Sequence, residues 1–102
     1  MTTTPSHTPD DQERLVVEVH GHVQGVGFRY FTRGVARKLN IRGLVRNDPN
    51  GIVTVVAEGP SEALNEFLSA LHQGPDLAEV DEVDESWEAA RGRFDGFSIE
   101  YY

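Results

Sequence analysis

Residues 22–29 read HVQGVGFR, and they connect a strand-like segment to a helix-like one. Before them, Leu15, Val17 and Val19 alternate with other residues at the period of a strand that buries one face. The two glycines of the stretch allow a tight bend that brings backbone N–H groups to a common point. A helix N-terminus follows at once and carries Arg29 on its first turn. Such an arrangement is suited to holding a phosphate-sized anion.

The apolar residues after this stretch predict a helix and then a hairpin. Four of them recur at spacings of three, four and four residues: Phe28, Phe31, Val35 and Leu39. This spacing gives an amphipathic helix of about three turns. Residues 48–51, Asp-Pro-Asn-Gly, are a strong turn signal between two strands, so residues 44–57 are predicted to form a hairpin.

A second helix and two further strands complete the predicted elements. The helix starts at Pro60 or Ser61 and ends at Gly74, and strands follow over residues 80–87 and 97–101. Two helices on one face of an antiparallel sheet bury these apolar stripes economically. The order of elements therefore predicts an α+β fold, a ferredoxin-like split β-α-β sandwich with an antiparallel sheet of four to five strands.

Length and composition limit what the chain can be. Its 102 residues suffice for one domain, predicted over residues 14–102, and residues 1–13 are predicted to form a disordered N-terminal tail. That tail lacks the basic start and apolar centre of a signal peptide. No apolar run is long enough to span a membrane, and the absence of cysteine excludes disulfides and thiolate chemistry. We expect a cytoplasmic monomer with no membrane partner.

The charge is acidic overall but unevenly distributed. A formal net charge of −8 argues against a nucleic-acid partner. One stretch nevertheless holds six basic residues and no acidic one: Arg29, Arg33, Arg37, Lys38, Arg42 and Arg46. Most of them are expected to form a solvated helix face. They also place a positive field around the glycine-containing stretch, which attracts anions against the net charge.

Arg29 and Asn47 are the polar residues that stand out. The guanidinium of Arg29 can bind two phosphate oxygens at once, whereas a surface salt bridge is its alternative role. Asn47 ends a strand before a turn, where asparagine commonly bonds its own backbone. In a split β-α-β fold its strand can lie beside the first strand, and an amide there could both donate to and accept from a water molecule.

Metal and nucleotide sites are not predicted. The loop matches neither the Walker A nor the Rossmann fingerprint, and the chain has no HExxH motif. His20 and His22 stand near the start of the loop and could act as bases, although strand-end histidines are more often structural or exposed. The acidic residues from Asp76 to Glu88 are expected to form a solvated surface rather than a cation site. We therefore predict no cofactor and no metal.

Two separate motifs resemble the acylphosphatase family. Residues 21–29, GHVQGVGFR, are similar to its first signature, and residues 43–47, GLVRN, with the turn that follows, are similar to its second. The resemblance extends over about residues 14–102. It implies metal-independent hydrolysis of a small-molecule acyl phosphate to a carboxylate and inorganic phosphate, without a phosphoenzyme.

The resemblance also implies a role for each site residue. Arg29 would hold the phosphoryl group together with the backbone of the loop, and Asn47 would orient the attacking water. The loop residues are His22, Val23, Gln24, Gly25, Val26, Gly27 and Phe28. His22 departs from the family pattern, in which Arg or Lys is common at this position. A histidine there weakens the positive field of the loop or makes it pH-dependent.

Two other functions stay open at this point. The same fold can serve as a non-catalytic binding module, here for a small anionic ligand. It also occurs as a domain that processes carbamoyl phosphate within a larger maturation protein. RNA recognition would need exposed aromatic and basic residues on the sheet, whereas the fourth strand is acidic. The presence of both Arg29 and Asn47 favours a catalytic site.

Overall fold

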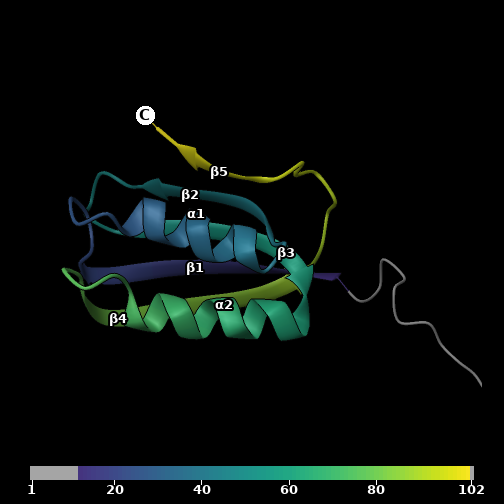
Figure 1. Ribbon diagram of the computed structural model, residues 1–102, viewed down its shortest axis with the longest axis horizontal. Helices are drawn as coiled ribbons and strands as arrows, with labels where there is room; N and C mark the ends of the chain where they lie inside the picture. The colour runs from purple at the N-terminus through teal and green to yellow at the C-terminus, as the bar shows by residue number, and fades with distance from the viewer. Residues whose placement is uncertain (1–11, 102) are drawn as a thin grey trace, which may run out of the picture.

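The computed structural model describes residues 12–101 and shows a five-stranded sheet with both helices on one face (Figure 1). The elements are, in chain order, β1 (Gln12–His22), α1 (Phe28–Lys38), β2 (Arg42–Asn47), β3 (Val53–Pro60), α2 (Ser61–Gln73), β4 (Glu79–Ala89) and β5 (Phe97–Glu100). The strands lie in the spatial order β4-β1-β3-β2-β5. This arrangement confirms the predicted ferredoxin-like α+β fold.

The sheet is mixed, which corrects the expectation that it is antiparallel throughout. β1 pairs antiparallel with β3 and β4, and β2 pairs antiparallel with β3. β5 instead pairs parallel with β2, with Phe97 opposite Gly43. The chain crosses from β4 at one edge of the sheet to β5 at the other. The direction in which β5 arrives depends on this crossover and not on the local pattern of the strand.

The core lies between the helices and the inward face of the sheet. The predicted alternation on β1 is confirmed, because Leu15, Val17 and Val19 are fully buried. On α1, Thr32 is also fully buried, which the apolar spacing did not indicate. Its hydroxyl donates a hydrogen bond to the carbonyl oxygen of Phe28 at 2.8 Å. This polar group is therefore satisfied inside the core.

A buried carboxylate anchors the connection between β4 and β5. Glu58 on β3 is 5% exposed. It accepts hydrogen bonds from Nε of Arg14 at 2.7 Å and from the backbone N–H groups of Arg91 and Gly92 at 2.9 and 3.0 Å. Burial alone would raise the pKa of Glu58, but these hydrogen bonds outweigh burial and hold the pKa below its ordinary value.

The boundary of the folded region lies slightly earlier than expected. Gln12 and Glu13 pair with Pro60 and Gly59 of β3, so β1 includes two residues that were assigned to the tail. The rest of the predicted tail lies outside the described residues. Within residues 12–101, no helix is long and apolar enough to cross a membrane.

The topology brings the ends of two strands to the same end of the sheet, where the strands terminate. β3 lies between β1 and β2, so the strand of Asn47 is not beside the first strand as expected. Both strands are antiparallel to β3 and therefore run in the same direction. Their last residues, His22 and Asn47, therefore lie at the same end of the sheet, on the left in Figure 1. The loop that leads into α1 and the turn between β2 and β3 both start there.

Candidate active site

The loop between β1 and α1 presents open backbone N–H groups. Gly25 and Gly27 adopt left-handed conformations, with φ of 78° and 81°, which residues with a side chain adopt only at a cost. None of the N–H groups of residues 24–27 donates to an acceptor within residues 12–101. Successive N–H groups around left-handed glycines form a concave site that favours an anion.

The N-terminus of α1, directly behind the loop, is uncapped. Its N-cap residue, Gly27, supplies no side-chain hydrogen bond, and no acidic residue stands in the first turn. The partial positive charge of this helix end is therefore not offset by a neighbouring carboxylate of the same turn. Arg29 adds a full positive charge at the same place, so helix end and side chain together favour a bound anion.

Arg29 is half-buried and is positioned by an aromatic ring from the other end of the chain. Its guanidinium carbon lies 4.9 Å from the ring centroid of Tyr101, within cation–π distance. Tyr101 directly follows β5, whose pairing with β2 brings it level with Asn47. A hydrogen bond with Tyr30 raises the pKa of the Tyr101 phenol. Within the described residues Arg29 makes no ion pair, so the salt-bridge role is not observed.

Asn47 directs an unpaired oxygen into the protein near the loop. It shares the inward face of β2 with Val45 and pairs in register with Val53. Its Oδ1 atom is buried and has no hydrogen-bond partner within residues 12–101. Buried polar atoms without partners are rare, because desolvation without a hydrogen bond costs free energy. This atom is therefore free to accept a hydrogen bond from a water or a ligand.

The side chain of Gln24 ties the loop to the turn between β2 and β3. Its Nε2 atom donates to the carbonyl oxygens of Asp48 at 2.8 Å and of Ile52 at 3.0 Å. The turn is itself fixed, because the Asp48 carboxylate accepts hydrogen bonds from Nε of Arg46, at 2.9 Å, and from the hydroxyl of Thr54. Loop and turn are therefore held in position relative to one another.

The other predicted loop residues differ in what they offer a ligand. Val23 and Phe28 are buried in the core, so only their backbone is available. Val26 is partly buried and packs against the same core. His22 is exposed and has no side-chain partner within the described part of the chain. The backbone of the loop is thus the component that could bind an anion, and the side chains mostly support it.

All three comparisons with known proteins find the acylphosphatase family. The acylphosphatase family model matches residues 15–99. The chain belongs to the acylphosphatase family. The acylphosphatase of Salinibacter ruber is 46% identical over 88 residues, which cover 86% of this chain and 93% of that protein. The acylphosphatase of Thermus thermophilus is 49% identical over 86 residues, which cover 84% of this chain and 97% of that protein.

A solved structure extends the similarity to three dimensions. The crystal structure of the acylphosphatase from Bacillus subtilis matches this chain with a TM-score of 0.85 at 36% sequence identity. The match covers 87% of this chain and 99% of that one. The family resemblance noted in the two sequence motifs is thereby confirmed over nearly the whole described fold.

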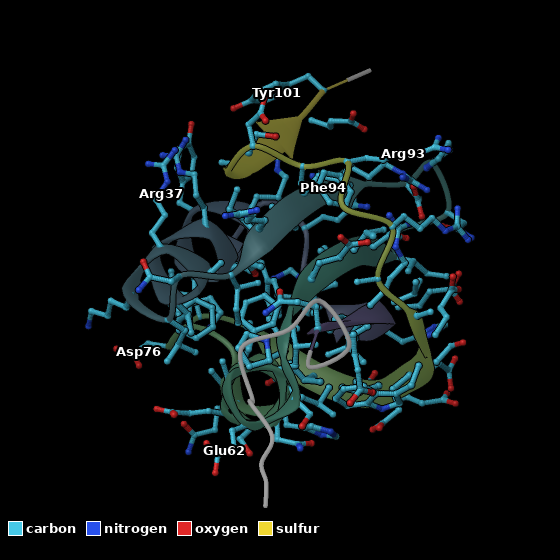
Figure 2. All side chains as sticks on the ribbon, turned by 90° about the vertical axis from the view of Figure 1, so that its right-hand side faces the viewer. Arg37, Glu62, Asp76, Arg93, Phe94 and Tyr101 are labelled. Atoms are coloured by element: carbon cyan, nitrogen blue, oxygen red, sulfur yellow. The ribbon has the colours of Figure 1, made fainter. Side chains whose placement is uncertain are left out.

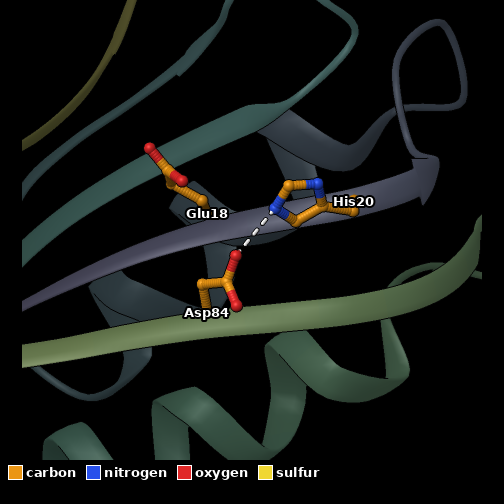
Figure 3. A group of neighbouring side chains, drawn as sticks. All are labelled: Glu18, His20 and Asp84. Carbon is orange, nitrogen blue, oxygen red and sulfur yellow. Dashed lines mark hydrogen bonds and ion pairs between the residues drawn. The ribbon is translucent and has the colours of Figure 1, made fainter.

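One group of side chains away from the acylphosphatase motifs could hold a metal ion. Glu18 and His20 on β1 and Asp84 on β4 have donor atoms within 4.8 Å of one another (Figure 3). Nε2 of His20 lies 3.0 Å from Oδ2 of Asp84. The inward residues of β1 are Leu15, Val17 and Val19, so His20 lies on the opposite face of the sheet. This position does not support His20 as a base that faces the loop.

Sequence reasoning missed two residues that position the acylphosphatase motifs. Gln24 was expected to contribute its backbone, and Tyr101 was assigned only to the last strand. The available signal for Gln24 was a long polar side chain in a loop otherwise made of glycine and valine. Nothing local signals the contact between Tyr101 and Arg29, because the two residues lie far apart in the sequence.

Proposed function

We propose that this acylphosphatase binds the phosphoryl group of an acyl phosphate with the N–H groups of residues 24–27 and the guanidinium of Arg29, and that Asn47 orients the attacking water. Hydrolysis of acyl phosphates is the activity that membership of the family supports. The assignment of roles rests on the geometry. The observation that carries it is the buried, unpaired Oδ1 of Asn47.

The anion site and the water site are adjacent in this proposal. Gln24 belongs to the loop and donates to Asp48, the residue directly after Asn47. A phosphoryl group held by the loop therefore lies near the amide of Asn47. That amide can accept one hydrogen bond from a water and donate another, which fixes the water without removing its proton.

The chemical step needs little from the protein beyond positioning. The water oxygen forms a bond to phosphorus while the bond between phosphorus and the acyl oxygen breaks, and the carboxylate leaves with the bonding electrons. The water proton passes to a phosphoryl oxygen of the substrate, so no protein base is required. Charge on the phosphoryl oxygens is stabilised by Arg29 and the loop N–H groups, which are already in place before the reaction.

The experiment that tests this assignment is hydrolysis of benzoyl phosphate in the presence of EDTA. Arg29→Lys retains the charge but loses the planar, two-point contact with phosphate, and we expect kcat/KM to fall at least tenfold. Asn47→Ala removes the water contact, so kcat should fall steeply while inorganic phosphate still competes with substrate. Lys38→Ala, at the far end of α1, is the matched control and should retain wild-type rates.

Each result bears on a different part of the proposal. Near-wild-type rates in both Arg29→Lys and Asn47→Ala, with intact folding, would refute the site assignment. No turnover by the folded wild-type protein would favour the non-catalytic binding module. Carbamoyl phosphate, assayed beside benzoyl phosphate, tests the carbamoyl-processing alternative. We also propose a cytoplasmic monomer that does not bind nucleic acid, and size-exclusion chromatography with light scattering tests the oligomeric state.

A further inference from the structure

A groove lies at the end of the molecule opposite the loop. It is formed where the last turn of α1, the start of β2 and the connection between β4 and β5 meet. Its volume is about 660 Å³. A second hollow of about 740 Å³ adjoins it and shares Asn40, Arg42 and Phe94 with it. The two hollows therefore form one continuous surface feature, which faces the viewer in Figure 2.

Arginine side chains from three separate elements line this groove. Arg37 comes from α1, Arg42 from β2 and Arg93 from the connection between β4 and β5. Figure 2 shows Arg37 and Arg93 on either side of Phe94. The first hollow contains one carboxylate, that of Asp95, so its lining carries a net positive charge in a protein whose net charge is −8.

Most of this positive charge is available to a ligand. Arg42 and Arg93 make no side-chain hydrogen bond, ion pair or ring contact within residues 12–101. Arg37 uses one nitrogen, Nη2, to donate to the carbonyl oxygen of Phe97 at 3.3 Å. Glu58 lines the second hollow, but its carboxylate is already paired with Arg14.

The wall that carries Arg93 is held in place by the fold. Glu58 accepts the N–H groups of Arg91 and Gly92, and the N–H of Gly43 donates to the carbonyl oxygen of Gly96 at 2.9 Å. Hydrogen bonds therefore tie one end of the segment that carries Arg93 to β3 and the other end to β2. The segment is therefore already ordered before a ligand binds, and the free energy of binding is not reduced by the entropy of ordering it.

The end of α1 does not oppose an anion as strongly as a bare helix C-terminus would. The carbonyl oxygens of Val35, Ala36 and Arg37 accept hydrogen bonds from the N–H groups of Leu39, Asn40 and Ile41. These bonds satisfy acceptors that would otherwise face the groove. The guanidinium groups then dominate the local electrostatics.

We propose that this groove binds a small polyanion that carries two or more phosphate groups. Each guanidinium presents a planar fork that fits two phosphate oxygens. A single phosphate could engage only part of a set that is distributed over three elements, whereas a phosphate chain could contact several of its members. The groove is separate from the loop site and lies at the other end of the fold, so the proposal does not depend on the catalytic assignment.

The test is isothermal titration calorimetry with inorganic tripolyphosphate and, in a second arm, with magnesium-free ATP. Because the loop site can itself hold a phosphate, the double variant Arg42→Gln, Arg93→Gln is compared with its parent in an Arg29→Ala background, where it should weaken tripolyphosphate binding at least tenfold. Arg33→Gln with Lys38→Gln removes the same charge from α1 outside the groove and should change binding less than threefold. Arg29→Ala removes the main side chain of the loop site and should leave groove binding intact. Binding of ATP as well would show that a nucleotide can supply the phosphate chain.

Three outcomes would overturn the proposal. The first is the absence of wild-type binding to either ligand at millimolar concentration. The second is a double variant at Arg42 and Arg93 that binds within twofold of its Arg29→Ala parent. The third is loss of binding in Arg29→Ala, which would place the polyanion at the loop. Amide chemical shifts in Arg29→Ala provide the positional check, since this variant lacks the main phosphate-binding side chain of the loop, and they should move in residues 93–98.

Discussion

Gln24 offers a direct test of whether the loop must be fixed to the turn for catalysis. Gln24→Met keeps the length of the side chain and removes the donor of the two hydrogen bonds to Asp48 and Ile52. Both carbonyl oxygens keep another partner, because the Asp48 carbonyl accepts from Gly51 N–H at 3.2 Å and the Ile52 carbonyl from Asp48 N–H at 2.8 Å. The substitution therefore leaves no carbonyl group of the turn unpaired.

The size of the effect follows from this count of bonds. Two neutral hydrogen bonds contribute about 1 kcal/mol each, and no desolvation penalty is added, so the free energy of unfolding should fall by about 1–2 kcal/mol. For a domain of this size, each kcal/mol lowers Tm by about 4–8 °C. Activity should suffer more, because displacement of bound groups by about 1 Å can reduce the rate about a hundredfold. We expect kcat/KM for benzoyl phosphate to fall about 10- to 100-fold, mainly through kcat.

The assay compares kinetics and thermal unfolding in the same preparations. Gln73→Met is the matched control, because Gln73 is exposed at the end of α2 and has no side-chain partner in the described region. It should alter neither Tm nor rate. A Gln24→Met protein that loses the expected stability yet hydrolyses benzoyl phosphate within twofold of wild type would refute the positioning role. The two hydrogen bonds would then serve the fold alone.

Two further predictions concern the supports of the fold and of Arg29. Folding lowers the pKa of Glu58 below its ordinary value of 4.5. The ionised Glu58 side chain therefore stabilises the fold fully above pH 4.5, and this stabilisation is lost as the pH falls through the pKa of the folded state. Glu58→Gln should therefore lower Tm at pH 7 by about 10 °C, for a loss of about 2 kcal/mol in the free energy of unfolding. Circular dichroism melts at pH 3 should show a smaller difference in Tm between the wild type and this variant. The exposed control Glu66→Gln should have the same Tm as the wild type. A Tm difference for Glu58→Gln that does not change with pH would contradict the stabilising role of the ionised Glu58 side chain. Tyr101→Ala removes a largely exposed cation–π contact with Arg29, so kcat/KM should fall about two- to fivefold, whereas Tyr101→Phe keeps the ring and should retain the wild-type value. Equal kinetics in the alanine and phenylalanine variants would show that the ring does not position Arg29.

The sequence predicts the parts of the site that depend on local chemistry. Gly25 and Gly27 indicated a bend that only glycine adopts readily, and both are left-handed in the structure. The period of the apolar residues indicated the strand before the loop and the helix after it, which puts Arg29 on the first turn. Each of these inferences uses residues of one continuous stretch of the chain, where backbone preferences and the period of the side chains are informative.

The features that sequence reasoning missed depend on long-range pairing. The parallel pairing of β5 with β2 decides which residue meets Arg29, and it results from a crossover between opposite edges of the sheet. The contact of Gln24 with the turn spans 24 residues. Thr32 was overlooked for a different reason, because a hydroxyl can be buried when it bonds the preceding turn of its own helix.

The acidic net charge is compatible with an anionic substrate because the carboxylate that directly follows Asn47 in the sequence is bonded on the outward face of the sheet. Asp48 directly follows Asn47 and would repel a phosphoryl group if it faced the same way. Its carboxylate instead bonds Arg46 and Thr54, which lie in register on the outward face of the sheet. Asn47 faces inward, toward the helices, where Arg29 and the open end of α1 supply positive charge. Because successive side chains of a strand point to opposite faces, the carboxylate of Asp48 is kept away from the face on which Asn47 and Arg29 lie. A local positive charge on that face can attract a phosphate although the net charge of the chain is negative.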